Sequence, residues 1–176
     1  MTRVVAVVLL IIGCTGFASA EVVDAGPTGF SVTTTVEVNA PQASVFRALS
    51  EQIARWWDSA HTFSGSAANL TIEARAGSCF CERLPAGTVQ HMVVTHVNAP
   101  TLLVLQGGLG PLGTMGVAGS LAWTLQERNG RTVLQLNYNV GGYMPGGFVS
   151  LAPVVDGVLA IQVKRLKTFA ETGRPE

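Results

Sequence analysis

The chain has 176 residues, and its 11 Lys and Arg side chains are balanced by 11 Asp and Glu side chains, so its formal net charge is zero. This length fits one domain with a core of its own. Binding to nucleic acid depends on an excess of basic side chains, so we expect no nucleic acid and no other polyanion as a partner.

Residues 1–20 have the pattern of an export signal. Arg3 supplies a positive charge, an apolar stretch follows at 4–12, and small residues at 18–20 form a cleavage site, so the mature chain would begin near Glu21. The apolar stretch ends well short of the roughly 20 residues that span a membrane. We expect an exported protein, periplasmic or secreted, whose mature chain has no stable membrane span.

A lipoprotein signal is the alternative for the same segment. The run Ile11-Ile12-Gly13-Cys14 is similar to a bacterial lipobox, which would place a lipid anchor on Cys14. Acyl labelling of Cys14 separates the two alternatives.

Residues 21–29 contain two glycines and a proline and have no periodic pattern, so we predict an extended lead-in there. From Phe30 to Val38, apolar and polar residues alternate, which indicates a strand with one covered face. Apolar residues then recur at helical spacing over residues 41–57, which predicts one helix or two short ones.

Three strands are predicted next. The first runs from Leu70 to about Leu84 and bends at Gly77, and the others lie at 88–97 and 101–105. Turn signals that contain proline separate them, so the strands should pair as an antiparallel meander.

The following hairpin can be predicted in register, because Asn129-Gly130 is a strong signal for a two-residue turn. Pairing about this turn places large apolar residues opposite one another: Leu125 with Leu134, Trp123 with Leu136, and Leu121 with Tyr138. The other face is polar, so one side of the hairpin should meet the core.

The stretch from Leu151 to Ala170 has the pattern of a long amphipathic helix, with Ser150 as its N-cap. Its apolar side is wide enough to suit a helix held by a curved sheet, and consists of Leu151, Val154, Val155, Val158, Leu159, Ile161, Leu166 and Phe169. Gln162 and Arg165 interrupt this side, and a buried polar group costs about 1–3 kcal/mol unless it is hydrogen-bonded. Either the helix borders a wet or ligand-filled space, or these two side chains reach its rim.

The order of elements predicts an α+β fold, in which a curved antiparallel sheet wraps around a long C-terminal helix and short helices follow the first strand. We divide the chain into an export signal at 1–20, a lead-in at 21–29 and a single domain at 30–172.

Three stretches resemble the SRPBCC superfamily, which has the START-like, or helix-grip, fold. They are Ala40-Pro41 through Val45-Phe46-Arg47-Ala48-Leu49, then Ile53-Ala54-Arg55-Trp56-Trp57, and the terminal segment 151–172. The resemblance covers about residues 30–172 and is closer to the branch of the heat-shock ATPase activators, beside the polyketide cyclases. It is specific for the fold and not for the function, because the superfamily includes lipid carriers, receptors, cyclases and co-chaperones.

The resemblance implies a cavity between the sheet and the terminal helix. An exported chain would not meet the cytosolic partner of the co-chaperones, so we do not carry that activity over. From polarity and position, we expect Trp56 or Trp57, Phe80, Trp123, Tyr143 and Gln162 to line the cavity, with the Gln162 amide orienting the bound molecule.

The two adjacent tryptophans would point about 100° apart on a helix. One should therefore be buried and the other at the cavity mouth, unless both pack under the edge of the sheet.

Cys79-Phe80-Cys81 leaves three alternatives open: packed thiols, a disulfide between Cys79 and Cys81, or a metal site. Alternate residues of a strand lie about 6.6 Å apart, at the long limit for a disulfide, so a bond would need a local bend. A turn at 85–87 would bring Cys81 close to His91, but a fourth metal ligand is not apparent.

The chain has no recognisable catalytic motif. The Gly-x-Ser-x-Gly and His-Glu-x-x-His signatures are absent. The stretch 108–113 spells Gly-x-Gly-x-x-Gly without a helix pattern after it, so we interpret 108–119 as a loop over the cavity mouth. His61 is best explained as a solvated loop histidine. We assign no catalytic residue, no cofactor and no metal.

We predict an exported binding protein that holds an apolar small molecule or lipid between the sheet and the C-terminal helix, with any catalytic activity and any protein partner unassigned. One alternative is a cyclase- or hydrolase-type enzyme that uses the same pocket. It requires an inward-facing titratable pair, and its candidates are His61, His91, His96 and Tyr143. Another is a non-catalytic interaction module of the cell envelope, which predicts a filled core and a sizeable exposed apolar patch.

Overall fold

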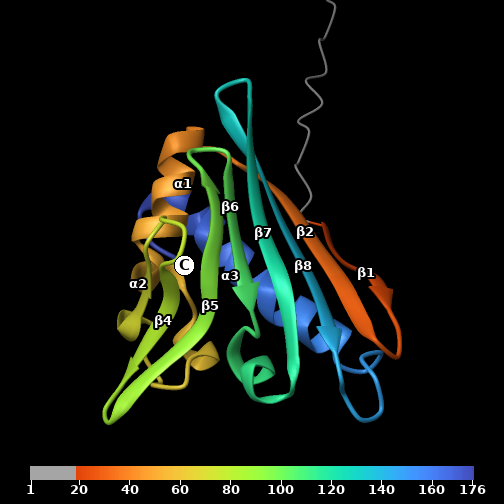
Figure 1. Cartoon of the computed structure of the whole chain (residues 1–176). Coiled ribbons are helices and arrows are strands. Elements are labelled where there is room, and N and C mark those ends of the chain that lie inside the picture. Colours follow the sequence, from red (N-terminus) through yellow and green to blue (C-terminus); the bar gives the residue numbers. More distant parts are fainter. Residues whose placement is uncertain (1–18) are drawn as a thin grey trace, which may run out of the picture.

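The computed structural model describes residues 19–176. Most of the expected export signal, including the lipobox alternative at Cys14, lies outside the described residues. Eight antiparallel strands form one sheet in the order β1-β2-β8-β7-β6-β5-β4-β3. Helix α3 lies behind this curved sheet and packs against β1, β2 and α1 (Figure 1). The predicted α+β helix-grip architecture is confirmed.

The strands are β1 (Ser19–Ala25), β2 (Gly29–Val38), β3 (Leu70–Ile72), β4 (Cys79–Leu84), β5 (Gly87–Asn98), β6 (Leu102–Gly107), β7 (Val117–Arg128) and β8 (Arg131–Gly142). The helices are α1 (Gln42–Glu51), α2 (Ile53–Trp56) and α3 (Ala152–Thr172). Short 3-10 helices lie in the connections: η1 (Ser59–His61), η2 (Ala67–Asn69) and η3 (Gly110–Thr114).

Strand β2 confirms the alternation predicted from Phe30 to Val38. Every second side chain from Phe30 onward is buried, and the strand pairs with β8 along its whole length. Its buried face contributes to the core on which α3 packs.

The hairpin of β7 and β8 has the predicted register. Leu125 lies opposite Leu134, Trp123 opposite Leu136, and Leu121 opposite Tyr138, and all six side chains are buried. Asn129 and Gly130 have φ angles of 54° and 78°, the left-handed conformation that a two-residue type I′ turn requires at both central positions.

The predicted lead-in is mostly an edge strand of the sheet. Residues 19–25 form β1, which pairs with β2, for example Val22 with Val32. The register shifts between Val22 and Asp24, and a bulge of this kind breaks the two-residue period by which a strand is recognised in a sequence.

The prediction of a single bent strand from Leu70 to Leu84 is wrong. The structure has two strands, β3 and β4, which pair with each other, with Leu70 opposite Glu82 and Ile72 opposite Phe80. The Ser78 hydroxyl donates to the backbone carbonyls of Glu73 and Arg75, and these bonds close the connection between the strands.

The predicted helical segment 41–57 divides into α1 and α2. The C-terminal helix extends two residues beyond Ala170, to Thr172, and Gly173 follows in the left-handed conformation. Ser150 is not its N-cap, because that position is held by Leu151 without a side-chain hydrogen bond. No helix among residues 19–176 combines the length and apolar character needed to cross a membrane.

One side of α3 carries the buried side chains Ala152, Leu159, Gln162, Val163, Leu166 and Phe169. Ile161, expected on this side, is 42% exposed, because it lies about 200° around the helix from Leu159. Arg165 is half-buried, and its guanidinium donates to the Trp56 carbonyl at 2.8 Å.

Candidate functional site

A cavity of about 290 Å³ lies between the sheet and the first half of α3. On the helix side it is lined by Leu151, Val154, Val155, Val158 and Leu159, and on the sheet side by Leu70, Phe80, His91 and Tyr138. Residues from two connections complete the wall: Trp57, Ala60, His61, Thr62 and Phe63, and Leu109, Gly110, Pro111, Leu112 and Met115. Since most of these side chains are hydrocarbon, the cavity suits an apolar occupant.

The tryptophan pair has one member in this wall. Trp57 lines the cavity, packs against Phe80 with ring centroids 5.5 Å apart, and donates from its indole nitrogen to the His61 carbonyl at 3.1 Å. Trp56 is fully buried and donates to the Ala48 carbonyl at 2.8 Å. Trp57 is also buried, so neither ring is at an open mouth.

Two other expected lining residues lie elsewhere. Trp123 is buried in the β7–β8 part of the core and does not line the cavity. Tyr143 is 80% exposed in the connection that follows β8. For Trp123, the alternation of side chains along the hairpin cannot separate a core position from a cavity position, because both lie on the covered face of the sheet.

Gln162 faces the interior but does not line the cavity. Its side-chain oxygen accepts from the backbone N–H of Asp58 at 2.9 Å, and its side-chain nitrogen lies 3.1 Å from Nδ1 of His61. Because the oxygen is an acceptor, the amide nitrogen donates to His61. Gln162 therefore holds His61, which does line the cavity, instead of meeting a bound molecule directly.

Glu82, on β4, is a buried carboxylate that the sequence analysis did not single out. It accepts hydrogen bonds from the backbone N–H groups of Phe63 and Ser64, and one of its oxygens lies 3.0 Å from Nε2 of His91. Burial opposes its ionisation, but the bonds from Ser64, Phe63 and His91 outweigh burial and hold the pKa of Glu82 below its ordinary value. Glu82 is therefore a stable carboxylate next to a cavity-lining imidazole.

The ring of His91 is buried between aromatic neighbours. Phe63 is parallel to it, with an interplanar angle of 7° and centroids 5.7 Å apart, and the centroid of Phe80 lies 5.1 Å away. The expected neighbour of His91 was Cys81, but the hairpin closes with Leu84 opposite Gly87, which places Cys81 opposite Gln90, and the register shift that follows leaves His91 as the extra residue of β5.

A signal for this pair was present in the sequence. Phe80 and Glu82 are two residues apart on one strand, so a carboxylate shares the face of a core aromatic residue. Such a carboxylate needs a buried partner, and His91 on the neighbouring strand provides it.

Tyr138 closes the sheet side of the cavity. Its hydroxyl accepts from the backbone N–H of Leu109 at 3.1 Å and donates to the Gly107 carbonyl at 3.2 Å. Burial raises the pKa of Tyr138 to about 12, against the effect of the Leu109 bond. The phenol therefore remains neutral and ties the connection between β6 and β7 to the sheet.

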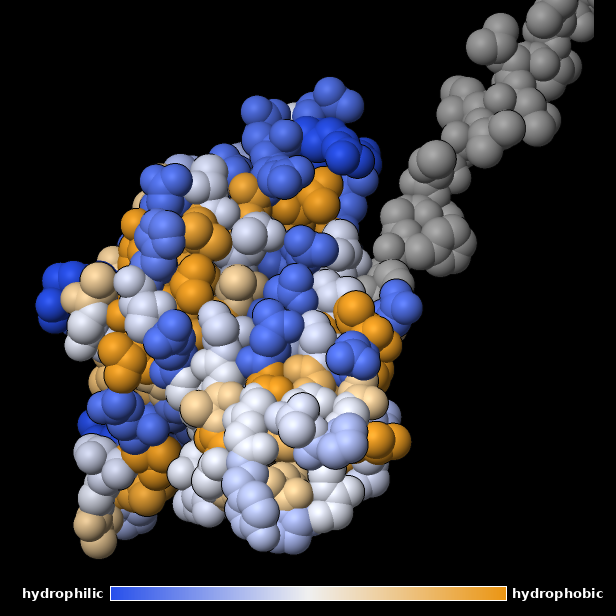
Figure 2. Space-filling model, turned by 45° about the vertical axis from the view of Figure 1, so that its right-hand side comes forward, coloured by the Kyte–Doolittle hydropathy of each residue, from blue (hydrophilic) through white to orange (hydrophobic). Residues whose placement is uncertain are grey.

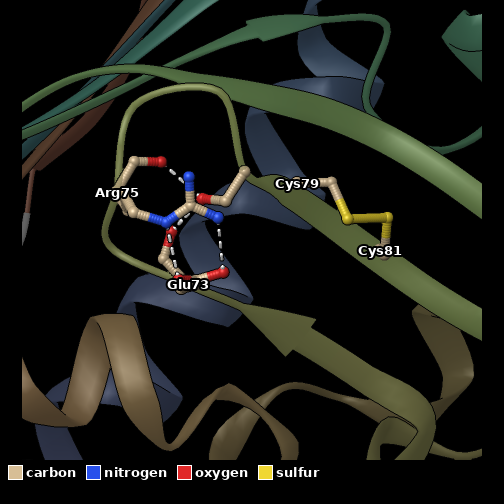
Figure 3. Close-up of a disulfide and its surroundings, with 5 residues drawn as sticks. Glu73, Arg75, Cys79 and Cys81 are labelled. Carbon is tan, nitrogen blue, oxygen red and sulfur yellow. Dashed lines mark hydrogen bonds and ion pairs between the residues drawn. A yellow bond between two sulfur atoms is a disulfide. The ribbon is translucent and has the colours of Figure 1, made fainter.

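Of the three alternatives for the cysteines, the structure contains the disulfide between Cys79 and Cys81. Their Cα atoms are 5.4 Å apart, closer than in a regular strand, and the register of β4 against β5 shifts within this stretch, between Phe80 and Cys81. Both cysteines alternate with the buried side chains of β4, so the disulfide lies on the other face from Glu82. It lies beside the connection that carries the Glu73–Arg75 ion pair (Figure 3). Within residues 19–176, no group of three or more His, Cys, Asp or Glu side chains is placed to hold a metal ion.

The curved sheet, the long C-terminal helix and the cavity between them define a helix-grip protein of the SRPBCC superfamily. Residues 29–171 match the model of the family described as polyketide cyclase / dehydrase and lipid transport, and the chain belongs to this family. No curated protein matched the chain.

Solved structures share the fold at low sequence identity. A conserved protein of unknown function from Enterococcus faecalis is 16% identical, with a TM-score of 0.61 over 89% of this chain and 78% of that one. The Aha1 dimer from Colwellia psychrerythraea is 14% identical, with a TM-score of 0.59 over 81% and 97% of the two chains. CalU16 from Micromonospora echinospora is 15% identical, with a TM-score of 0.56 over 92% and 87%. At these identities the similarity shows the fold alone.

Proposed function

We propose that this protein binds an apolar small molecule, or one chain of a lipid, in the cavity between the sheet and α3. The observation that carries the proposal is the cavity itself, whose wall is mostly hydrocarbon and is formed by the sheet, α3 and two connections. The family description, which includes both cyclases and lipid transport, agrees with a ligand-binding role.

The size of the cavity limits the occupant. At about 30 Å³ for each water-sized group, 290 Å³ holds about ten non-hydrogen atoms. A two-ring compound or part of one acyl chain fits this space. A larger lipid would have to extend outward, past the exposed cavity-lining side chains Phe63, Met115 and Val154.

We further propose that the protein acts after export, in the periplasm or outside the cell. The support is the signal-like pattern of residues 1–20. A disulfide between Cys79 and Cys81 is compatible with an oxidising compartment.

The binding proposal can be tested with two tryptophan variants of α3. In Val158→Trp a large ring projects into the cavity, whereas in Ile161→Trp the same ring is added on the exposed side of the helix. We expect the wild type and Ile161→Trp to bind naphthalene, a two-ring hydrocarbon of suitable size, and Val158→Trp to lose this binding. Solvent extraction of the natively expressed protein, followed by mass spectrometry, should identify the natural ligand. Absence of any bound apolar compound, together with no naphthalene binding, would contradict the proposal.

A cyclase-type enzyme is a second candidate, and the Glu82–His91 pair favours it. An enzyme in this pocket needs a titratable pair that faces inward, and these two side chains are buried, hydrogen-bonded and joined to the cavity wall. A base at this position would take a proton from the carbon next to a ketone and leave an enolate. In D₂O the protonated base exchanges its proton with the solvent, and the enolate carbon then takes up a deuteron. We expect 2-tetralone to exchange these hydrogens faster with the wild type than with His91→Gln, as followed by NMR. Equal rates would exclude this activity.

The interaction-module alternative required a filled core and a sizeable apolar patch. The cavity does not agree with a filled core. On the face shown in Figure 2, apolar and hydrophilic residues are interspersed. Nothing in these features favours this alternative over ligand binding.

A further inference from the structure

One nitrogen of His91 has no hydrogen-bond partner among residues 19–176. Nε2 bonds to Glu82, whereas Nδ1 is buried and unpaired. The side chain is only 5% exposed, and its ring belongs to the cavity wall. A buried polar atom is normally paired, so an unpaired one in a cavity wall calls for a partner that is not part of the chain.

The hydrogen-bond pattern around Glu82 determines what this nitrogen offers. The carboxylate already accepts from two backbone N–H groups, and as an acceptor it leaves Nε2 of His91 as the donor. In the neutral imidazole the single ring proton is then on Nε2. Nδ1 consequently presents a lone pair and can accept a hydrogen bond.

The other polar side-chain atoms that are buried in the wall have partners. The Tyr138 hydroxyl bonds to Leu109 and Gly107, and Nδ1 of His61 accepts from Gln162. Within the described part of the chain, His91 Nδ1 is the one buried side-chain polar atom of the wall without a partner. The cavity therefore combines a mostly hydrocarbon wall with a single buried acceptor that is unmatched.

We propose that His91 Nδ1 accepts a hydrogen bond from a hydroxyl or N–H group of the ligand, so that the cavity selects an apolar molecule with one donor, such as a phenol or an enol. This inference rests on the proposed function, because it specifies the ligand of the same cavity. The imidazole is flanked by the aromatic rings of Phe63 and Phe80 and is buried, and burial strengthens a hydrogen bond formed there.

Three matched probes separate the donor from the hydrocarbon. 2-Naphthol carries a hydroxyl, 2-methoxynaphthalene carries the same oxygen without a donor, and naphthalene carries neither. We expect the wild type to favour 2-naphthol over 2-methoxynaphthalene by a ratio that falls about three- to tenfold in His91→Phe, the contribution of one neutral hydrogen bond. Naphthalene, whose binding does not use Nδ1, is measured in both proteins to show how far the substitution alters the hydrocarbon part of the cavity.

His91→Gln provides a second variant in case His91→Phe does not fold. Its amide nitrogen can reach the position of Nε2 and keep the bond to Glu82, while the acceptor at the position of Nδ1 is lost. The same fall in the ratio is expected. In the wild type, the ¹⁵N resonance of His91 Nδ1 should have the shift of an unprotonated nitrogen and should move on addition of 2-naphthol but not of 2-methoxynaphthalene.

The outcomes distinguish the two proposals. If all three probes bind and the ratio is unchanged in both variants, the role of His91 is refuted and the cavity still binds apolar molecules. A protonated Nδ1 in the free wild type refutes the role of His91 as well. If no probe binds the wild type, the proposed function fails and this inference fails with it.

Discussion

Replacing Glu82 by Gln tests the buried carboxylate on which the site is built. Glu82 accepts hydrogen bonds from the backbone N–H groups of Phe63 and Ser64 and from His91. Gln has almost the same shape but only one acceptor oxygen, and its amide nitrogen cannot accept. At least one of the three donors therefore loses its partner while it remains buried.

The magnitude follows from these contacts. A hydrogen bond to a charged group contributes about 1.5–3 kcal/mol, and leaving a buried donor unpaired costs about 1–3 kcal/mol. We expect the free energy of unfolding of Glu82→Gln to be lower than that of the wild type by about 2–4 kcal/mol at pH 7. Urea denaturation without reductant, followed by tryptophan fluorescence, measures this difference. Glu51→Gln is the matched control, because Glu51 is an exposed glutamate and its replacement should change the free energy by less than about 0.5 kcal/mol.

The pH dependence provides a second and independent test. The pKa of Glu82 is lower in the folded protein than its ordinary value of 4.5. Such a carboxyl contributes stability that is present above the unfolded pKa and is lost as the pH falls through the folded pKa. The difference between wild type and Glu82→Gln should therefore be full at pH 7 and should shrink progressively below pH 4.5. A difference that is absent at pH 7, or that stays constant down to pH 3, would refute this account of the site.

Three further predictions use the same denaturation assay. Gly119→Ala should destabilise the protein by about 2–4 kcal/mol, because the new Cβ would lie 2.3 Å from the Asn139 carbonyl, whereas Gly87→Ala meets no atom within 4 Å and should have little effect. Tyr138, with a pKa of about 12, keeps its proton when the unfolded chain loses it, so stability should fall from pH 10 to 12, and this fall should be smaller in Tyr138→Phe. Burial and the charge of Glu21 raise the pKa of Asp156, so its ionised form destabilises the fold above that pKa. Asp156→Asn should therefore be more stable than the wild type at pH 7 by about 0.5–1 kcal/mol. An equal or lower stability would contradict this.

The parts of the fold that depend on neighbouring residues were predictable from the sequence. The turn at Asn129-Gly130 has its own backbone requirement, and the alternation on either side of it leaves one register that buries every large apolar residue. The same holds for β2, where each second residue is buried, and for the length of α3. Local periodicity is sufficient for such elements because one face of each is covered by the core.

Irregular backbone was not predictable in this way. The bulge in β1 interrupts the alternation, so this strand was predicted as an extended lead-in. The hydrogen bonds of Ser78 close a connection between β3 and β4, where the sequence predicted one continuous strand. In the β4–β5 hairpin, Leu84 pairs with Gly87, so Cys81 lies opposite Gln90, and a second register shift between Phe80 and Cys81 leaves His91 as an extra residue in β5. An extra residue in one strand has no counterpart in the alternation, so only the paired strand reveals it.

The sequence alone determined the class of fold, the covered faces of its regular elements and the presence of an apolar interior, because these follow from periods of two and 3.6 residues along the chain. Only the tertiary structure decided which covered positions line the cavity and which belong to the solid core, as Trp57 and Trp123 illustrate. It also decided that Glu82 and His91 form a pair and that Gln162 supports His61. These contacts join different elements, in the last case across 101 positions of the chain, and such contacts arise from the packing of strands and helices together and not from any local pattern of residues.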